Sequence, residues 1–210
     1  MKKIIMGTGL VCLLAACQNS TEKKHETMTD SSMQEMDHTG GTVNEMKTLM
    51  NGMMMKMHGQ QATGDNDIDF AAMMLEHHKG AVAMAKLELD KGKDTAMKQF
   101  AQAVINAQEK EISFMNDFIA KTQKKISPDA TNFQEGLAAS MKAMMEDSTR
   151  SYNDTDKDFA AQMIPHHQSA VGMAKNYLRY GENKELKKMS RDIVDSQSRE
   201  IGWLKDWLKM

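Results

Sequence analysis

Apolar side chains recur with a helical period along two stretches of the chain, and each stretch reads as a pair of helices. We predict helices over 67–89 and 94–121 in the first stretch, and over 156–180 and 183–209 in the second. An Asp before the first helix of each pair and a Gly shortly after it are typical of helix ends. Neither hairpin can bury its apolar stripe alone, so we expect an all-α fold in which the two hairpins pack as a four-helix bundle.

A shorter Met-rich helix is expected ahead of each pair. The first spans 46–57, and its methionines are Met46, Met50, Met53, Met54, Met55 and Met57. The second spans 133–147, in the connection that contains Pro128, and its methionines are Met141, Met144 and Met145. We interpret the first of these helices, together with the residues before it, as a flexible reservoir of soft metal ligands.

The chain contains an internal duplication. Residues 69–86 read DFAAMMLEHHKGAVAMAK and residues 158–175 read DFAAQMIPHHQSAVGMAK, so 12 of 18 positions are identical at an offset of 89. The same offset pairs further residues without a gap: Gly92 with Gly181, Gln108 with Gln197, Glu111 with Glu200, and Ile112 with Ile201. We therefore place a duplicated bundle domain at 43–208, with repeat one at 43–121 and repeat two at 132–209.

Both histidines of each His-His pair face the predicted core. On a helical projection of roughly 100° per residue, His77 and His78 share an arc of about 140° with the apolar side chains, whereas Glu76 and Lys79 lie opposite. The other members of this arc are Phe70, Met73, Met74, Ala81, Met84 and Ala85. The arc of the second copy holds Phe159, Met163, His166, His167, Ala170 and Met173.

Polar residues interrupt the apolar stripe of the second helix in each repeat. Gln108 and Glu111 lie inside the stripe of repeat one, and Gln197 and Glu200 lie inside that of repeat two. A buried carboxylate without a partner is costly, and the inward-facing partners available are the His pairs. We infer that Glu111 and Glu200 orient the imidazoles from outside the coordination sphere or ligate a metal directly, with the two glutamines in support.

The N-terminus has the features of an export signal. Lys2 and Lys3 precede an apolar stretch at 4–16 that is too short to span a membrane as a mature helix. The stretch ends in Leu-Ala-Ala followed by Cys17, which resembles the lipobox of a bacterial lipoprotein. We predict a signal peptide at 1–16, lipid on Cys17 and a disordered tether at 17–42. An ordinary secretory signal is the alternative, and either signal exports the chain to the periplasmic or cell-surface face.

Composition then narrows the chemistry. Methionine accounts for 23 of 210 residues, and 27 basic against 29 acidic residues leave no basic excess for nucleic acid. Cys12 leaves with the signal and Cys17 carries lipid, so the mature chain has no thiol for a zinc, iron–sulfur or thiolate copper site. Thioethers bind Cu(I) and Ag(I) and contribute little to Mg, Ca or Mn sites. The pattern therefore favours copper or silver, and the imidazoles also tolerate Cu(II).

We place the metal ligands at residues that keep a fixed spacing from a His pair in both repeats. These residues are Met74, His77, His78, Met84, Met163, His166, His167 and Met173. The alternative is a buried His–Glu–Gln network that only fixes helix register. Met97, Met115 and Met189 are interpreted as packing. Pro165 either bends its helix harmlessly or aims the second His pair differently.

No motif demands a reaction. A di-iron oxidase needs Glu-x-x-His on two bundle helices, and the only such spacings are Glu22–His25 and Glu35–His38, both ahead of the predicted helices. His-Glu-x-x-His, a Gly-rich phosphate loop and a Gly-x-Ser-x-Gly elbow are absent from the sequence. We therefore predict that the protein is not an enzyme.

The paired pattern Asp-Phe-x-x-x-Met-x-x-His-His-x-x-Ala-x-x-Met-Ala, followed by Gln-x-x-Glu-Ile, resembles the bacterial "domain of unknown function 305" family, which includes the CopM-type periplasmic copper-binding proteins. The resemblance covers about residues 65–208 in both copies. It implies a ferritin-like bundle, Cu(I) or Ag(I) binding and copper resistance outside the cytoplasm. Gln162 and Pro165 stand where repeat one has Met73 and Glu76, which breaks the symmetry of the two sets.

The leading hypothesis is a lipid-anchored, extracytoplasmic protein that binds Cu(I) or Ag(I) for sequestration or resistance. A copper-handling protein that gives or takes the ion is a candidate partner. Two alternatives from other classes stay open. One is a helical interaction module at the membrane surface that binds no metal, and the other is a ferritin-like redox enzyme.

Overall fold

The computed structural model describes residues 44–145 and 151–210, which belong to one compact unit running from 40 to 210. Within these ranges the chain forms seven helices and no strand. The helices are α1 (Glu45–His58), α2 (Asn66–Lys91), α3 (Thr95–Lys121), α4 (Ala130–Ser140), α5 (Lys142–Met145), α6 (Thr155–Tyr180) and α7 (Lys184–Trp207). None of these described helices is long and apolar enough to cross a membrane. The predicted signal peptide, Cys17 and the tether lie outside the described residues.

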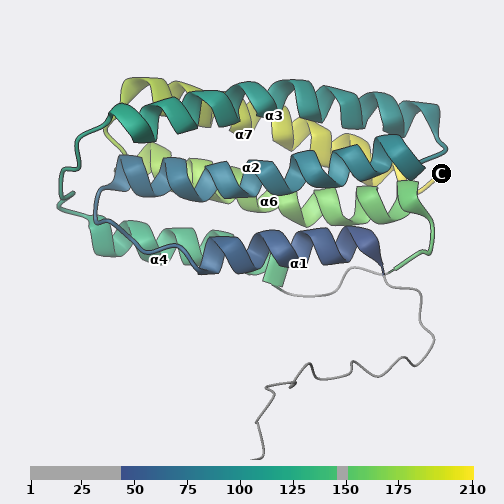
Figure 1. Ribbon diagram of the computed structural model, residues 1–210, viewed down its shortest axis with the longest axis horizontal. Helices are drawn as coiled ribbons and strands as arrows, with labels where there is room; N and C mark the ends of the chain where they lie inside the picture. The colour runs from purple at the N-terminus through teal and green to yellow at the C-terminus, as the bar shows by residue number, and fades with distance from the viewer. Residues whose placement is uncertain (1–43, 146–150) are drawn as a thin grey trace, which may run out of the picture. The chain divides into compact units, whose positions relative to one another are not determined.

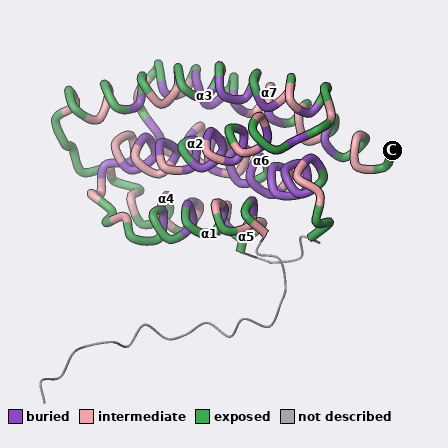
Figure 2. Tube along the Cα trace, turned by 45° about the vertical axis from the view of Figure 1, so that its right-hand side comes forward, coloured by how far each residue is buried: buried purple, intermediate pink, exposed green. Residues whose placement is uncertain are grey.

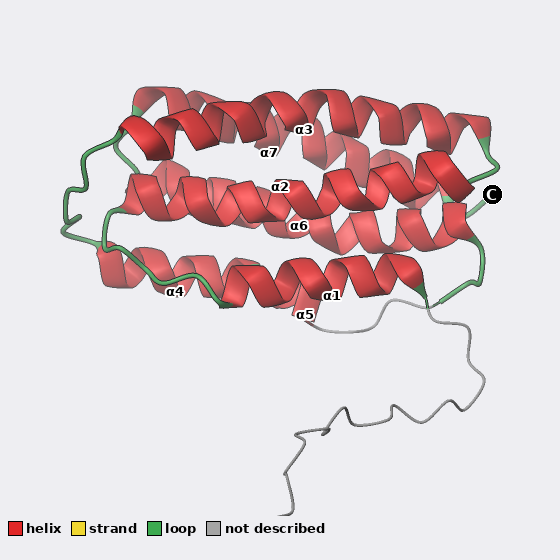
Figure 3. Cartoon of the chain, viewed as in Figure 1, coloured by secondary structure: helices red, strands yellow, loops and turns green. Residues whose placement is uncertain are grey.

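The helices of this unit lie in three layers (Figure 1, Figure 3). In the middle layer, α2 and α6 pack on each other. On one side, α3 packs on α2 and α7 packs on α6, and on the other side α1 covers α2 and α4 covers α6. Figure 2 shows that burial is concentrated along α2 and α6. The predicted four-helix bundle is confirmed for α2, α3, α6 and α7, and α1 and α4 add a third layer.

The ends of the four long helices agree with the predicted ends to within two residues, because polar caps mark their starts. The Asp65 carboxylate accepts hydrogen bonds from the backbone N–H groups of Asp67 and Ile68 at the start of α2. Asp94 and Asn183 cap α3 and α7 in the same way. Each cap satisfies backbone donors that have no partner within the first helical turn.

The two repeats are related by a pseudo-twofold axis between α2 and α6. At one end of this pair, Tyr177 Oη and the backbone N–H of Glu182 both donate to Asp67 Oδ1, at 2.6 and 2.9 Å. At the other end, the backbone N–H of Lys93 donates to Asp156 Oδ1 at 3.0 Å. Both the acceptors and the backbone donors are related by the offset of 89. The two helices related by this axis, α2 and α6, are antiparallel, and they lie against each other near their midpoints.

The interpretation of the 46–57 helix as a flexible ligand reservoir is wrong. The methionines of α1 repeat at helical spacing on one face, and that face packs on α2. The buried ones are Met46, Met50, Met53, Met54 and Met57. Gly80 of α2 allows the close approach, because a Cβ there would collide with Sδ of Met53. Met55, which is 75% exposed, is the member that points away from the core.

The helix predicted at 133–147 is interrupted. It begins earlier, as α4, and ends at Ser140, whose hydroxyl donates to the backbone oxygen of Leu137 at 2.6 Å. A side-chain bond of this kind competes with the helical ladder. The backbone N–H of Met141 then bonds to Ala138, three residues back, before α5 begins. Residues 146–147 lie outside the described part of the chain.

Candidate metal centre

Two histidines meet at the pseudo-twofold axis, and we call His77 and His166 the inner histidines. Both are fully buried, and their ring centroids lie 3.6 Å apart at an interplanar angle of 34°. His77 Nε2 donates to the backbone oxygen of His166 at 3.1 Å, and His166 Nε2 donates to that of His77 at 3.0 Å. A carbonyl oxygen can only accept, so Nε2 carries the hydrogen in both rings. Each Nδ1 is therefore left with its lone pair.

The inner imidazoles are held in the neutral form. Burial lowers the pKa of His77 and of His166 well below the ordinary histidine value, and the neighbouring imidazoles lower both further. The neutral ring is the form that ligates metal ions. Their Nδ1 atoms are buried and have no hydrogen-bond partner among the described residues.

The next residue on each helix, His78 or His167, makes a pair with a glutamate of the neighbouring helix, and we call these two the outer histidines. His78 Nε2 donates to Glu111 Oε2 at 2.6 Å. His167 Nε2 lies 2.9 Å from Glu200 Oε2 without the alignment of a hydrogen bond. Both rings are fully buried, while the glutamate side chains are 26% and 33% exposed. The structure thus brings each predicted glutamate to the Nε2 atom of an outer histidine.

The polar groups around the histidines do not form a closed network. The Nδ1 atoms of both outer histidines are buried and, like those of the inner pair, lack a partner in the described part of the chain. Gln108 and Gln197 are buried on α3 and α7, and their Oε1 atoms are also without a donor among the residues described. Buried polar atoms are normally paired when they serve only to hold a structure together.

The predicted thioethers differ in their distance from the histidines along the helix. Met74 lies three and four residues before the two histidines of α2, so it shares their face. Met163 stands in the same relation to the pair on α6. Met84 and Met173 lie seven residues past the inner histidine of their own helix, which is about 10 Å of helix axis. All four methionines are fully buried.

Pro165 does not change the contact of the inner histidine that follows it. α6 continues as one helix from Thr155 to Tyr180, with Pro165 buried inside it. The two bonds that join the inner histidines, 3.1 and 3.0 Å long, are equivalent across the axis. His166 therefore makes the same contact as His77, which agrees with the interpretation of Pro165 as a harmless feature of its helix.

The donor set of this centre is not that of a hard-metal site. Across residues 44–145 and 151–210, no three His, Cys, Asp or Glu side chains are grouped so that they could hold a metal ion. A metal held at these histidines would take its remaining ligands from thioethers of the bundle. Imidazole nitrogen and thioether sulfur together suit Cu(I) and Ag(I).

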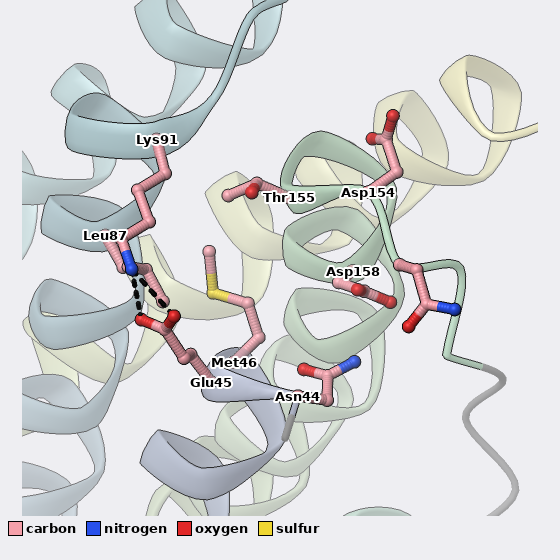
Figure 4. A pocket seen from close by; sticks show the side chains of 9 residues that line it. Asn44, Glu45, Met46, Leu87, Lys91, Asp154, Thr155 and Asp158 are labelled. Atoms are coloured by element: carbon pink, nitrogen blue, oxygen red, sulfur yellow. Dashed lines mark hydrogen bonds and ion pairs between the residues drawn. The ribbon is translucent and has the colours of Figure 1, made fainter. Parts of the chain in front are cut away.

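A surface hollow of about 180 Å³ at the start of α1 and α6 does not offer such donors (Figure 4). Its walls are dominated by amide, hydroxyl and carboxylate groups, and Lys91 Nζ donates to the Glu45 carboxylate at 2.7 Å. The thioether in its wall, Met46, is buried against the core. This hollow is therefore not part of the candidate metal centre.

The fold and the mirrored His pairs define a duplicated, ferritin-like helical bundle with buried nitrogen and sulfur donors at its centre. The chain belongs to the DUF305 family (domain of unknown function), whose sequence model matches residues 13–119 and 67–208. No curated protein matches the chain.

Solved structures support this assignment. CopM in an Ag-bound form is 32% identical, covers 71% of this chain and 97% of its own, and has a TM-score of 0.54. CopM in the Cu(I)-bound form is 33% identical, with the same coverage and a TM-score of 0.52. A DUF305 protein of Streptomyces coelicolor that is described as secreted is 25% identical, covers 70% of this chain and 93% of its own, and has a TM-score of 0.56.

Proposed function

We propose that this protein binds Cu(I) or Ag(I) at the buried His/Met centre, outside the cytoplasm, and sequesters the ion without turning over a substrate. The observation that carries the proposal is the set of four buried imidazole Nδ1 atoms, each of which lacks a partner among the described residues. Leaving one such acceptor unsatisfied costs about 1–3 kcal/mol. A bound ion would satisfy such an atom by accepting its lone pair.

The chemistry of the neighbours supports a soft ion. Met74 and Met163 share a helix face with the histidines, and the inner imidazoles are held neutral by burial. Neither feature is needed for a network that only fixes helix register, since a register device functions when its polar groups are paired. The related CopM structures with bound silver and copper support the same choice of ion.

We propose that the ion is held at a membrane surface, with Cys17 as the lipid attachment site. The support is the apolar stretch that ends in Leu-Ala-Ala-Cys, together with the relative described as secreted. Cys17→Ser is expected to move the protein from the membrane fraction to the soluble extracytoplasmic fraction. Retention of this variant in the membrane fraction would contradict lipid anchoring.

Competition titration of the full chain tests the metal proposal. Ag(I) is the better probe because it does not change oxidation state, and a chelator sets the free concentration. The double variant Met74→Leu, Met163→Leu keeps the shape of the core and removes two thioethers, so we expect silver to bind at least tenfold more weakly (about 1.4 kcal/mol).

The control is His58→Ala, which removes an exposed imidazole at the end of α1 and should leave the titration unchanged. Circular dichroism would verify that each variant is folded. Micromolar or weaker affinity in the full chain would refute the metal proposal and favour a helical interaction module. Oxygen-dependent oxidation of Cu(I) by the protein would instead favour the redox enzyme.

A further inference from the structure

A groove between α3 and α7 is lined by Glu111, the partner of the outer histidine of repeat one. Its volume is about 300 Å³. Its walls are formed by Lys110, Glu111, Phe114, Glu185, Lys188, Met189 and Asp192, and we call it the α3–α7 groove. The Glu111 carboxylate lines this groove and also accepts the hydrogen bond from His78. The Glu111 side chain therefore faces the groove and also contacts the buried imidazole of His78.

Met189 contributes a thioether to the wall of this groove from the opposite hairpin. It is 8% exposed, so its side chain lies at the boundary between the groove and the core. Met189 and Phe114 come from α7 and α3 and line the same space. Sequence interpretation assigned Met189 to packing because methionine at helical spacing is usually a core residue.

The pseudo-twofold axis shows what stands in this place in repeat two. The offset of 89 relates Phe114 to Trp203 and Met189 to Phe100. Phe100 and Trp203 stack on each other, with ring centroids 4.8 Å apart and an interplanar angle of 20°. The Phe100 ring centroid lies 6.4 Å from that of His167. An aromatic pair therefore fills, beside His167, the space that the α3–α7 groove occupies beside His78.

The same symmetry relates Met189 and His78 to Phe100 and His167, so we expect Met189 to stand next to His78. Met189 presents a thioether, which can coordinate a metal through a sulfur lone pair. Phe100 presents a hydrocarbon ring, which has no such lone pair. On the same side, Met74 and the free Nδ1 atom of His78 belong to one helix face. Repeat one therefore gathers soft donors from two hairpins, whereas repeat two gathers them from one.

We propose that Met189 is a thioether ligand, supplied by α7, for a soft ion held by His78, and that the two outer histidines are unequal. The His78 site is complete and is reached through the α3–α7 groove, with the Glu111 carboxylate drawing the cation to the groove. The His167 site lacks this third donor because Phe100 occupies its place. This inference rests on the proposed function, and it adds a ligand, an entry route and an order of affinity.

Two variants of the full chain test the inference in opposite directions. Met189→Leu keeps the packing volume and removes the sulfur, so the tighter Ag(I) equivalent in a chelator competition should weaken at least tenfold. Phe100→Met installs the missing sulfur beside His167, so the chain should gain a second equivalent of similar affinity. A residue that serves only packing would cause neither change.

The matched control is Met97→Leu. Met97 is a fully buried methionine of α3, and the offset of 89 pairs it with Leu186, so leucine is already accepted in the equivalent place. Silver binding by Met97→Leu should equal that of the unmodified chain. If the unmodified chain binds no silver, both this inference and the proposed function fail. If it binds silver and Met189→Leu binds equally well, or if two equal sites exist before Phe100 is changed, this inference alone is refuted.

Discussion

The four buried imidazoles share one residue-level feature, which is that each turns Nε2 towards an oxygen and leaves Nδ1 free. For the inner pair the oxygen is a backbone carbonyl of the opposite helix, and for the outer pair it is a carboxylate. At His77, His78 and His166 the hydrogen bond from Nε2 places the lone pair on Nδ1, so the fold sets the tautomer of these three rings. Ligand orientation by a partner at the other ring nitrogen is the usual arrangement at metal-binding histidines.

Sequence reasoning found part of this arrangement. The glutamates were predicted to reach the histidines because they interrupt an apolar stripe twice at the same offset. The pairing of His77 with His166 was not predicted, since it depends on how the two hairpins dock. Met189 was missed because its residue type is ordinary in a core. The sequence signal was the residue that the offset of 89 pairs with Met189. That residue is Phe100, so the equivalent positions of the two repeats differ in whether they carry a sulfur.

Glu88 is a buried acid whose role follows from the pseudo-twofold axis. It is fully buried near the end of α2, and neither carboxyl oxygen has a hydrogen-bond donor among the described residues. The offset of 89 pairs it with Tyr177, whose hydroxyl donates to Asp67. Burial, then the hydrogen bond and charge of Asp156, raise the pKa of Glu88 to about 9. Glu88 is therefore protonated at neutral pH and replaces the tyrosine hydroxyl as a donor.

The raised pKa of Glu88 makes stability depend on pH. In the unfolded state Glu88 has its ordinary pKa of 4.5 and loses its proton above that pH, whereas the folded state keeps the proton up to about pH 9. Its contribution to the free energy of unfolding is therefore full below pH 4.5 and is lost as the pH rises towards 9. Glu88→Gln removes this dependence. From pH 6 to pH 9, we expect the unmodified chain to lose about 3–4 kcal/mol relative to Glu88→Gln in urea unfolding. Glu109→Gln, at an exposed position, is the control, and parallel pH profiles for all three proteins would contradict the assignment.

At the scale of elements, α1 packs closely on α2 because Gly80 of α2 leaves room for the Met53 side chain of α1. The periodicity of α1 correctly predicted a helix, but periodicity alone does not say whether a partner covers the apolar face. The abundance of methionine suggested metal ligands there, whereas burial shows that these side chains are core. The packing of α1 on α2 could not be predicted, because the signal for it is the absence of a side chain at Gly80.

Gly80→Ala tests this contact. An added Cβ would collide with the side chain of Met53 from its Cβ to its Sδ, so the whole residue has to move. Overpacking of this kind costs about 1–3 kcal/mol, which exceeds the gain in helix propensity. Gly52→Ala on α1 is the matched control, since nothing lies within 4 Å of its added Cβ. Chemical unfolding should show a loss for the first variant and a gain of about 0.5–1 kcal/mol for the second. Equal stability of the two variants would refute the contact.

At the scale of the described unit, duplication has produced a pseudo-symmetric bundle with unequal halves. The helices and their ends were predictable, because caps and the repeat appear in the sequence twice. The three-layer arrangement was not, since the repeat pattern does not state which faces of the two copies meet. The axis places the inner histidines in contact at the centre, and the differences between the copies lie around it. A symmetric fold can in this way carry two sites of different affinity.

The central claim is that a soft ion binds at the Nδ1 atoms of the buried histidines. Nitrogen NMR of the full chain, with ¹⁵N-labelled histidine side chains and titrated with Ag(I), tests it most directly, because silver nuclei couple to a directly bonded nitrogen. We expect the Nδ1 resonance of His78 to shift first and to show silver coupling, while its Nε2 stays protonated. Silver coupling confined to the exposed His58 or to His25 and His38, with the buried resonances unchanged, would contradict the claim.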